Sequence, residues 1–153
     1  MRPKNAHHSP KGSFCTQLRT RFAETDLQGV VHHRHYLTYC EVARVEYFKA
    51  LGFDFHQARQ SGDFDLVVAE VRCRYLAPAR FDELLAIYTW VSQVRHTSFT
   101  LDYQIYRDDD KLLLATAQTT LVAINPQTKK ARALPEKMRH VLCQASGVLQ
   151  RLL

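Results

Sequence analysis

A carboxylate, a glycine and several imidazoles lie close together in one stretch of this 153-residue chain, between a strand-like run and a helix-like run. Asp26 supplies the carboxylate, and Gly29 follows three residues later. His32, His33 and His35 lie where the helix-like run begins. A carboxylate can act as a general base or as a nucleophile, and the free N–H groups at a helix start can bind an oxyanion. A strand-to-helix junction with these residue types therefore supplies the groups that an acyl-transfer site needs.

The histidines at 32, 33 and 35 also raise the question of a metal site. Residues one or two apart do not share a face of a helix. No cysteine or acidic residue completes a ligand set at the spacing that zinc sites use. The sequence therefore predicts neither a bound metal nor a cofactor.

Two elements must position this segment. Apolar and small residues alternate with polar ones through residues 14–22, which predicts a half-buried strand. Residues 34–51 have an apolar stripe at three- and four-residue spacing, which predicts a long helix. Val42 and Val45 widen that stripe, so we expect the helix to be deeply buried, and Gly52 is a stop signal.

Strand patterns dominate the chain after this helix. They cover residues 65–76, 82–95, 97–107 and 112–124, and we expect these four strands to form a meander. The 82–95 run is apolar on both faces, which indicates either a central strand or one covered by a partner subunit. Pro135 begins a C-terminal helix pattern. The pattern as a whole predicts an α+β fold with an antiparallel sheet.

Length and composition are those of one domain with one core. Hydrophobic residues make up 46% of the chain. No apolar run approaches the ~20 residues of a membrane span, so none is predicted. Residues 1–12 are polar, lack the apolar centre of a secretory signal, and are expected to be a disordered tail. Residues 13–153 are expected to form the single domain, including the C-terminal helix.

Charge is distributed unevenly. The net charge is +6, but residues 22–128 hold ten basic and fourteen acidic residues, a net −4, so the positive charge lies at the two ends. No basic and aromatic residues interleave as a platform for stacking bases, so no nucleic-acid partner is predicted. The scattered cysteines form no C-x-x-C pair and are interpreted as buried free thiols, which favours the cytoplasm; they are Cys15, Cys40, Cys73 and Cys143.

Three patterns in the chain are similar to those of a known enzyme family. The first is Asp-x-x-Gly-x-Val-x-His-x-x-Tyr, from Asp26 to Tyr36, with a helix pattern after it. The second runs from Tyr75 to Asp82, and a weaker third runs from Arg95 to Phe99. Together they resemble the hotdog-fold acyl-CoA thioesterases, and especially the 4-hydroxybenzoyl-CoA thioesterase type, over roughly residues 17–133.

The resemblance implies a fold and a reaction. The fold is an antiparallel sheet wrapped around one long central helix, here residues 34–51. The reaction is hydrolysis of a short-chain or aromatic acyl-CoA to the free acid and CoA. Open sheet edges and the two-sided 82–95 strand lead us to expect a homodimer or homotetramer, with pockets between subunits.

The resemblance also implies roles for individual residues. Asp26 would be catalytic, either as the base that activates water or as a nucleophile that forms a mixed anhydride. His33 would be catalytic through its backbone N–H, which contacts the thioester oxygen, and through its side chain. The substrate-binding positions would be Gly29, Val31, His32 and Tyr36.

Other interpretations of the same residues remain open. Asp26 can be a loop residue that caps a turn, and Tyr36 can be an ordinary core aromatic. Some relatives have a catalytic tyrosine four residues before the aspartate, where this chain has Phe22. The alternative functions are another acyl-thioester reaction of the same fold, such as dehydration, and a non-catalytic module that binds acyl-CoA or another partner.

Overall fold

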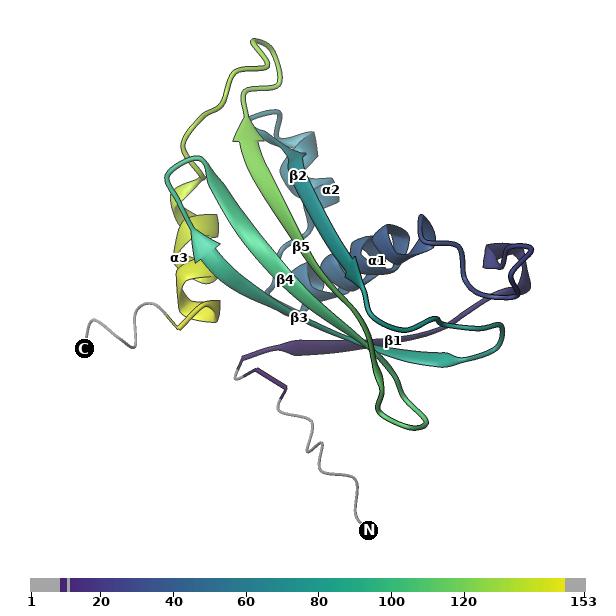
Figure 1. The fold of residues 1–153 in the computed structure, drawn as a ribbon. Coiled ribbons are helices and arrows are strands. Elements are labelled where there is room, and N and C mark those ends of the chain that lie inside the picture. The colour runs from purple at the N-terminus through teal and green to yellow at the C-terminus, as the bar shows by residue number, and fades with distance from the viewer. Residues whose placement is uncertain (1–8, 11, 148–153) are drawn as a thin grey trace.

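A computed structural model describes residues 9, 10 and 12–147, so most of the predicted N-terminal tail lies outside the described residues. Five antiparallel strands form one sheet in the order β1-β3-β4-β5-β2, and one long helix, α1, lies against it (Figure 1). The strands are β1 (Phe14–Arg19), β2 (Asp65–Tyr75), β3 (Leu84–Val94), β4 (Ser98–Arg107) and β5 (Leu113–Ile124). The helices are α1 (His35–Ala50), α2 (Phe55–Gln60), α3 (Glu136–Ala145) and the short 3-10 helix η1 (Phe22–Glu24). The predicted α+β fold, with a sheet around a long helix, is confirmed.

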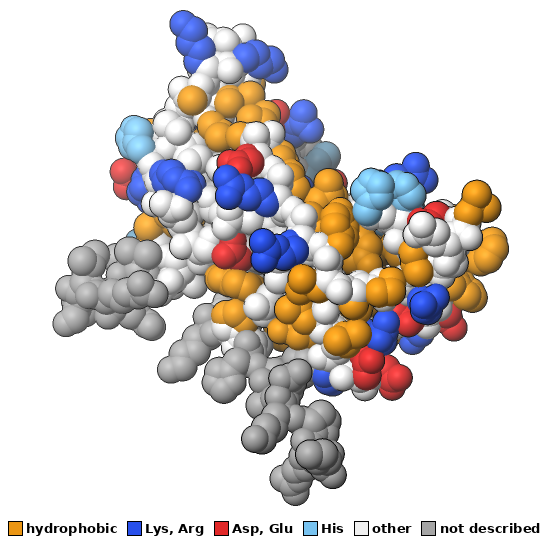
Figure 2. Space-filling view, viewed as in Figure 1, with side chains coloured by type: hydrophobic (Ala, Val, Ile, Leu, Met, Phe, Trp, Pro, Cys, Tyr) orange, Lys and Arg blue, Asp and Glu red, His pale blue; other side chains and the backbone are white. Residues whose placement is uncertain are grey.

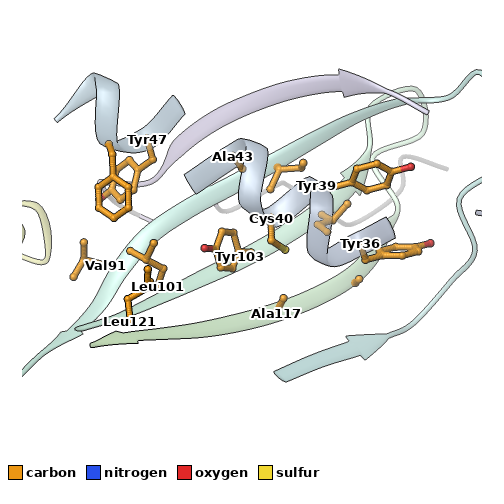
Figure 3. Close-up of a cluster of buried hydrophobic side chains, with 14 of the residues drawn as sticks. Tyr36, Tyr39, Cys40, Ala43, Tyr47, Val91, Leu101, Tyr103, Ala117 and Leu121 are labelled. Atoms are coloured by element: carbon orange, nitrogen blue, oxygen red, sulfur yellow. The ribbon is translucent and has the colours of Figure 1, made fainter. Parts of the chain in front are cut away.

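The core lies between α1 and one face of the sheet. Alternate residues of β4, such as Leu101 and Tyr103, point toward the helix because successive side chains of a strand point to opposite faces. The helix meets them with its buried stripe, which includes Cys40, Ala43 and Tyr47 (Figure 3). Burial of this apolar surface is the main favourable term that holds α1 on the sheet.

The predicted four-strand meander is wrong for its first strand. Strands β3, β4 and β5 do pair in sequence, but β2 pairs with β5, with Arg72 opposite Gln118. Strand β2 therefore forms one edge of the sheet, and β1 forms the other. The alternating pattern identifies a strand but carries no information about its neighbour, and α2 and its flanking loops lead the chain from α1 to the far edge (Figure 1).

Strand β3 lies between β1 and β4, so the central-strand interpretation of its apolar pattern is confirmed. Helix α3 follows Pro135, as expected, and packs against β3 through Met138 and Leu142, both of which are buried. The Arg139 guanidinium donates to the carbonyl oxygens of Arg95 and His96, at 2.7 Å each. These bonds tie α3 to the turn between β3 and β4.

Two burial predictions need correction. The predicted strand 14–22 ends at Arg19, and Phe22 begins η1 with 74% of its surface exposed. Helix α1 ends as expected before Gly52, but it is not deeply buried all round, because Val42 and Val45 are 42% and 40% exposed. An apolar stripe on a helix shows what prefers burial, but only the tertiary structure shows what covers it.

The cysteines are free, as predicted, but most of them are not buried. Cys40 is buried in α1, Cys15 is exposed, and Cys73 and Cys143 are half-buried. Strand alternation places Cys15 on the outward face of β1, where apolar character was the wrong guide.

Candidate active site

The segment from Glu24 to His32 folds as a small hairpin that projects beside the start of α1. The His32 N–H donates to the Glu24 carbonyl at 2.9 Å, and the Asp26 N–H donates to the Val30 carbonyl at 3.0 Å. The Gly29 N–H closes the turn onto the Asp26 carbonyl at 2.9 Å. Gly29 has φ = +74°, a conformation that residues with a side chain resist. Glycine is therefore required here by the turn itself, with open space around the position.

Asp26 lies at the start of the hairpin tip and is half-buried. One of its carboxylate oxygens accepts the Gln28 N–H at 2.8 Å, which is the turn-capping geometry that the sequence left open. Its other oxygen has no hydrogen-bond partner among the described residues. This hydrogen bond is compatible with a catalytic role of Asp26. It orients the carboxylate and leaves the other oxygen free to accept a proton from water or to attack a carbonyl carbon.

The start of α1 offers an unused donor. The His35 N–H donates to the His32 carbonyl at 3.0 Å, and the Arg34 N–H donates to His32 Nδ1 at 3.2 Å. The His33 N–H has no hydrogen-bond partner within the described part of the chain. It lies in the turn that precedes the helix, where the helix dipole adds positive potential. The predicted oxyanion donor is therefore free to act.

The imidazole rings of His32 and His33 stack at the same place, with centroids 4.1 Å apart. Because His32 Nδ1 accepts the Arg34 N–H, its Nε2 is the ring nitrogen left for other partners. His33 is exposed, and its ring contacts Tyr75 at a centroid distance of 6.2 Å. Burial and the neighbouring Arg34 lower the pKa of His35. Among the described residues no group of three or more His, Cys, Asp or Glu side chains could hold a metal ion.

Two tyrosines hold the start of α1 in place. The Tyr75 hydroxyl, at the end of β2, donates to the His33 carbonyl at 3.0 Å. Burial raises the pKa of Tyr75 to about 12, so the hydroxyl stays protonated at neutral pH and remains a donor. The Tyr36 hydroxyl accepts the Ala79 N–H at 3.0 Å, and the Val31 N–H donates to the Ala79 carbonyl at 2.8 Å. Tyr36 and Val31 are buried, so their demonstrated role is to tie the hairpin and helix to the loop after β2.

Sequence reasoning missed Glu24, which is only 3% exposed. Its carboxylate accepts the Tyr39 hydroxyl at 2.5 Å, and the Arg21 N–H and Nε at 2.8 and 2.9 Å. Burial opposes the ionised form, but the hydrogen bonds from Tyr39 and Arg21 outweigh it and hold the pKa of Glu24 below its ordinary value. No strand alternation could have indicated this burial, because the strand ends at Arg19 and Phe22, two residues before Glu24, is exposed.

A cavity of about 860 Å³ lies at the opposite end of α1, between α1, α2 and β2. Its floor is apolar and includes Phe53, Phe64, Leu66 and Leu121, and Arg44 and Lys49 contribute positive charge. Neither Asp26 nor His33 lines it. Within one described chain, the predicted catalytic residues and this cavity are therefore apart.

Exposed apolar side chains connect the two ends of α1. They lie on the inner face of β2 and on the flank of α1: Val68, Val71 and Tyr75, and Leu37, Val42 and Val45. Figure 2 shows hydrophobic side chains along this side of the molecule, close to a group of histidines. We call this surface the α1–β2 flank. A search of the described residues for a helix long and apolar enough to cross a membrane finds none.

Several known proteins are similar to this chain in sequence and in fold. The model of the thioesterase-like superfamily matches residues 20–142. The chain is 33% identical over 125 residues to the acyl-CoA thioester hydrolase YbgC of Escherichia coli, which covers 82% of this chain and 92% of that protein.

Solved structures give the same answer. The 1,4-dihydroxy-2-naphthoyl-CoA thioesterase Slr0204 from Synechocystis is similar with a TM-score of 0.81 at 27% identity, covering 86% of this chain and 96% of that one. A DHNA-CoA thioesterase from Staphylococcus aureus has a TM-score of 0.81 at 28% identity, with 92% of each chain covered. The chain therefore belongs to the thioesterase-like superfamily, and it is a hotdog-fold thioester hydrolase.

Proposed function

We propose that this enzyme hydrolyses the thioester between coenzyme A and a short-chain or aromatic acyl group. The observation that carries the proposal is that one hairpin and the helix start that follows it hold both an oriented carboxylate, Asp26, and an unused donor, the His33 N–H. The names of the similar proteins, an acyl-CoA thioester hydrolase and two naphthoyl-CoA or DHNA-CoA thioesterases, support the substrate class.

In this mechanism Asp26 either takes a proton from the attacking water or attacks the carbonyl carbon itself, forming a mixed anhydride that water then hydrolyses to the free acid. The charge that develops on the carbonyl oxygen is received by the His33 N–H, and the sulfur of coenzyme A leaves. Such a donor is worth most where it is already oriented, since no reorganisation is needed as the charge appears. Tyr75, which fixes the His33 carbonyl, supplies part of that orientation.

A second copy of the chain completes the enzyme in this proposal. Strand β2 is an open edge, and open apolar edges are normally paired or covered. The α1–β2 flank places exposed valines beside that edge. A two-fold dimer through this surface would set the two α1 helices antiparallel, because a two-fold contact joins the same patch on both subunits. The cavity of one subunit would then face the hairpin of the other, and its apolar floor would receive the acyl group.

The free cysteines support a reducing compartment, and we place the enzyme in the cytoplasm on that ground. The alternative functions, dehydration and simple binding, have no specific observation in their favour. They differ from hydrolysis in the product, since only hydrolysis releases a free thiol.

The test is a thiol-release assay with the purified chain across aliphatic and aromatic acyl-CoA thioesters. General-base catalysis contributes about 10²–10⁴-fold, so Asp26→Asn should lower kcat by that factor for every substrate turned over. Asp110→Asn is the control for turn capping, since the Asp110 carboxylate accepts the Leu112 N–H at 3.2 Å, although its other oxygen also pairs with Arg107 at 2.8 Å. Wild-type turnover by Asp26→Asn, or equal losses in both variants, would contradict the proposed mechanism.

A further inference from the structure

Glu24 is a buried ionised carboxylate that the proposed chemistry does not use. Each of its oxygens is occupied, one by the Tyr39 hydroxyl and the Arg21 N–H, and the other by the Arg21 guanidinium. Desolvating a carboxylate is costly unless hydrogen bonds replace its water. The three hydrogen bonds therefore allow Glu24 to remain ionised while buried, and they show which segments Glu24 connects.

The contacts of Glu24 join two separate pieces of the site. Its backbone carbonyl accepts the His32 N–H, so Glu24 forms the base of the hairpin whose tip carries Asp26. Its side chain accepts the hydroxyl of Tyr39, which lies in α1 fifteen residues further along the chain. The short Tyr39–Glu24 hydrogen bond thus links the base of the hairpin directly to α1, in addition to the bonds that Val31 and Tyr36 make with Ala79.

The two donors of Glu24 have different consequences. The bonds from Arg21 lie within four residues and stabilise η1, as a capping box does for a helix start. The bond from Tyr39 comes from another element and is not needed to close η1. If Glu24 served only to stabilise η1, the hydrogen bond from Tyr39 would not be needed.

From this connectivity we propose that Glu24, through Tyr39, is a positioning residue that fixes the Asp26 carboxylate relative to the His33 N–H during thioester hydrolysis. The proposal rests on the proposed function for its effect on rate, but not for its effect on structure. A displacement of about 1 Å between reacting groups can cost about 10²-fold in rate. The Glu24–Tyr39 hydrogen bond would limit that displacement without contacting the substrate.

The first experiment is a double-mutant cycle on thioester hydrolysis with Glu24→Gln, Tyr39→Phe and the double variant. Each single variant should lower kcat by about 10²-fold and leave KM within about threefold, because the substrate surface is intact. The double variant should be no worse than either single one, since both break the same connection. Tyr47→Phe is the control, because Tyr47 is a buried tyrosine of the same helix two turns further from the hairpin.

The second experiment measures amide hydrogen exchange of His32 in the same variants. Loosening the hairpin base should speed exchange of the His32 N–H, while amides of the central strands β3 and β4 keep their protection. This readout needs no substrate, so it decides the positioning role even if the wild-type chain hydrolyses none of the thioesters. Should Glu24→Gln fail to fold, Tyr39→Phe tests the same bond with the carboxylate and its Arg21 contacts kept.

Three results would overturn the proposal. One is wild-type kcat in both single variants. Another is a loss of activity that only follows the loss of folded protein, as shown by Tyr47→Phe behaving in the same way. The third is unchanged exchange at His32 in Tyr39→Phe.

Discussion

The two ends of α1 differ in how fully the single chain satisfies them. At the N-terminal end, the hydroxyls of Tyr36, Tyr39 and Tyr75 each bond to a neighbouring segment, and the hairpin carrying Asp26 is held at its base. At the C-terminal end, an open cavity of about 860 Å³ lies against exposed apolar side chains of α1 and β2. The N-terminal end is held by hydrogen bonds within the chain, whereas the C-terminal end leaves apolar surface exposed to solvent.

The difference shows how catalysis and acyl binding would be divided between the two ends in the proposed mechanism. Proton transfer and oxyanion binding need groups fixed to within fractions of an ångström, and local hydrogen bonds supply that precision. Binding an acyl group needs mainly apolar surface, which is non-directional and can be contributed by a second subunit. We therefore expect changes at the N-terminal end to alter kcat, and changes along the α1–β2 flank to alter assembly.

The largest expected effect is on assembly. Val71→Glu places a carboxylate on the inner face of β2, and the two-fold symmetry of the proposed dimer would repeat it in the partner. Leaving one buried charge unpaired costs about 3–5 kcal/mol, so two copies should weaken the dimer by about 10⁴-fold or more. Analytical ultracentrifugation should show monomers at micromolar concentration, with a lower rate of thiol release per chain.

The matched control for this prediction is Val67→Glu. Val67 is also an exposed valine of β2, but it pairs with Val122 on the outer face of the sheet. It should remain a dimer. Val71→Glu that sediments as the wild type does would place the subunit contact elsewhere.

An intermediate effect is expected on the pH dependence of stability. The pKa of Glu24 lies below its ordinary value of 4.5, so its contribution is complete above that pH and is lost as the pH falls through the lowered pKa. Hydrogen bonds to a charged group contribute about 1.5–3 kcal/mol, or roughly 5 °C in Tm for a chain of this length. Thermal unfolding should therefore separate wild type from Glu24→Gln at pH 7, with the gap closing at acid pH. A gap independent of pH would argue against an ionised Glu24.

The smallest effect is expected at Phe22, where some relatives have a tyrosine. Its ring is 74% exposed and contacts Phe81 edge to face, with centroids 5.7 Å apart. An added hydroxyl meets solvent, so Phe22→Tyr should change stability by less than about 0.5 kcal/mol. We expect kcat to stay within about threefold. A tenfold gain would show that a hydroxyl at this position takes part in the reaction.

Much of the fold could be predicted because its signals are local. Residues 34–51 carry a helical period, and the observed α1 covers residues 35–50. The later strands match their alternating patterns within about two residues, as in β4 at residues 98–107. The motif from Asp26 to Tyr36 predicted a site at the strand-to-helix junction, and the structure shows a carboxylate and a free helix-start N–H there. Their catalytic roles stay predictions until the variants are measured.

The errors share a different cause. Val42 and Val45 look like core residues in sequence, yet they are exposed because none of the described elements covers that flank. Glu24 looks like a surface acid, yet it is buried because Tyr39, fifteen residues away, replaces its water. Whether these valines and Glu24 are buried depends on which residues contact them, and the periodicity of the sequence does not identify those contacts.

By itself the sequence determined which segments are strands and helices, and it predicted where the chemistry lies, because backbone periodicity and a compact motif are properties of neighbouring residues. Only the tertiary structure decided that β2 forms the edge of the sheet beside β5. It also decided that Glu24 links the hairpin to α1 and that one flank of the helix is exposed. These are contacts between distant residues, and their free energy depends on which surfaces meet in space rather than on their order in the chain.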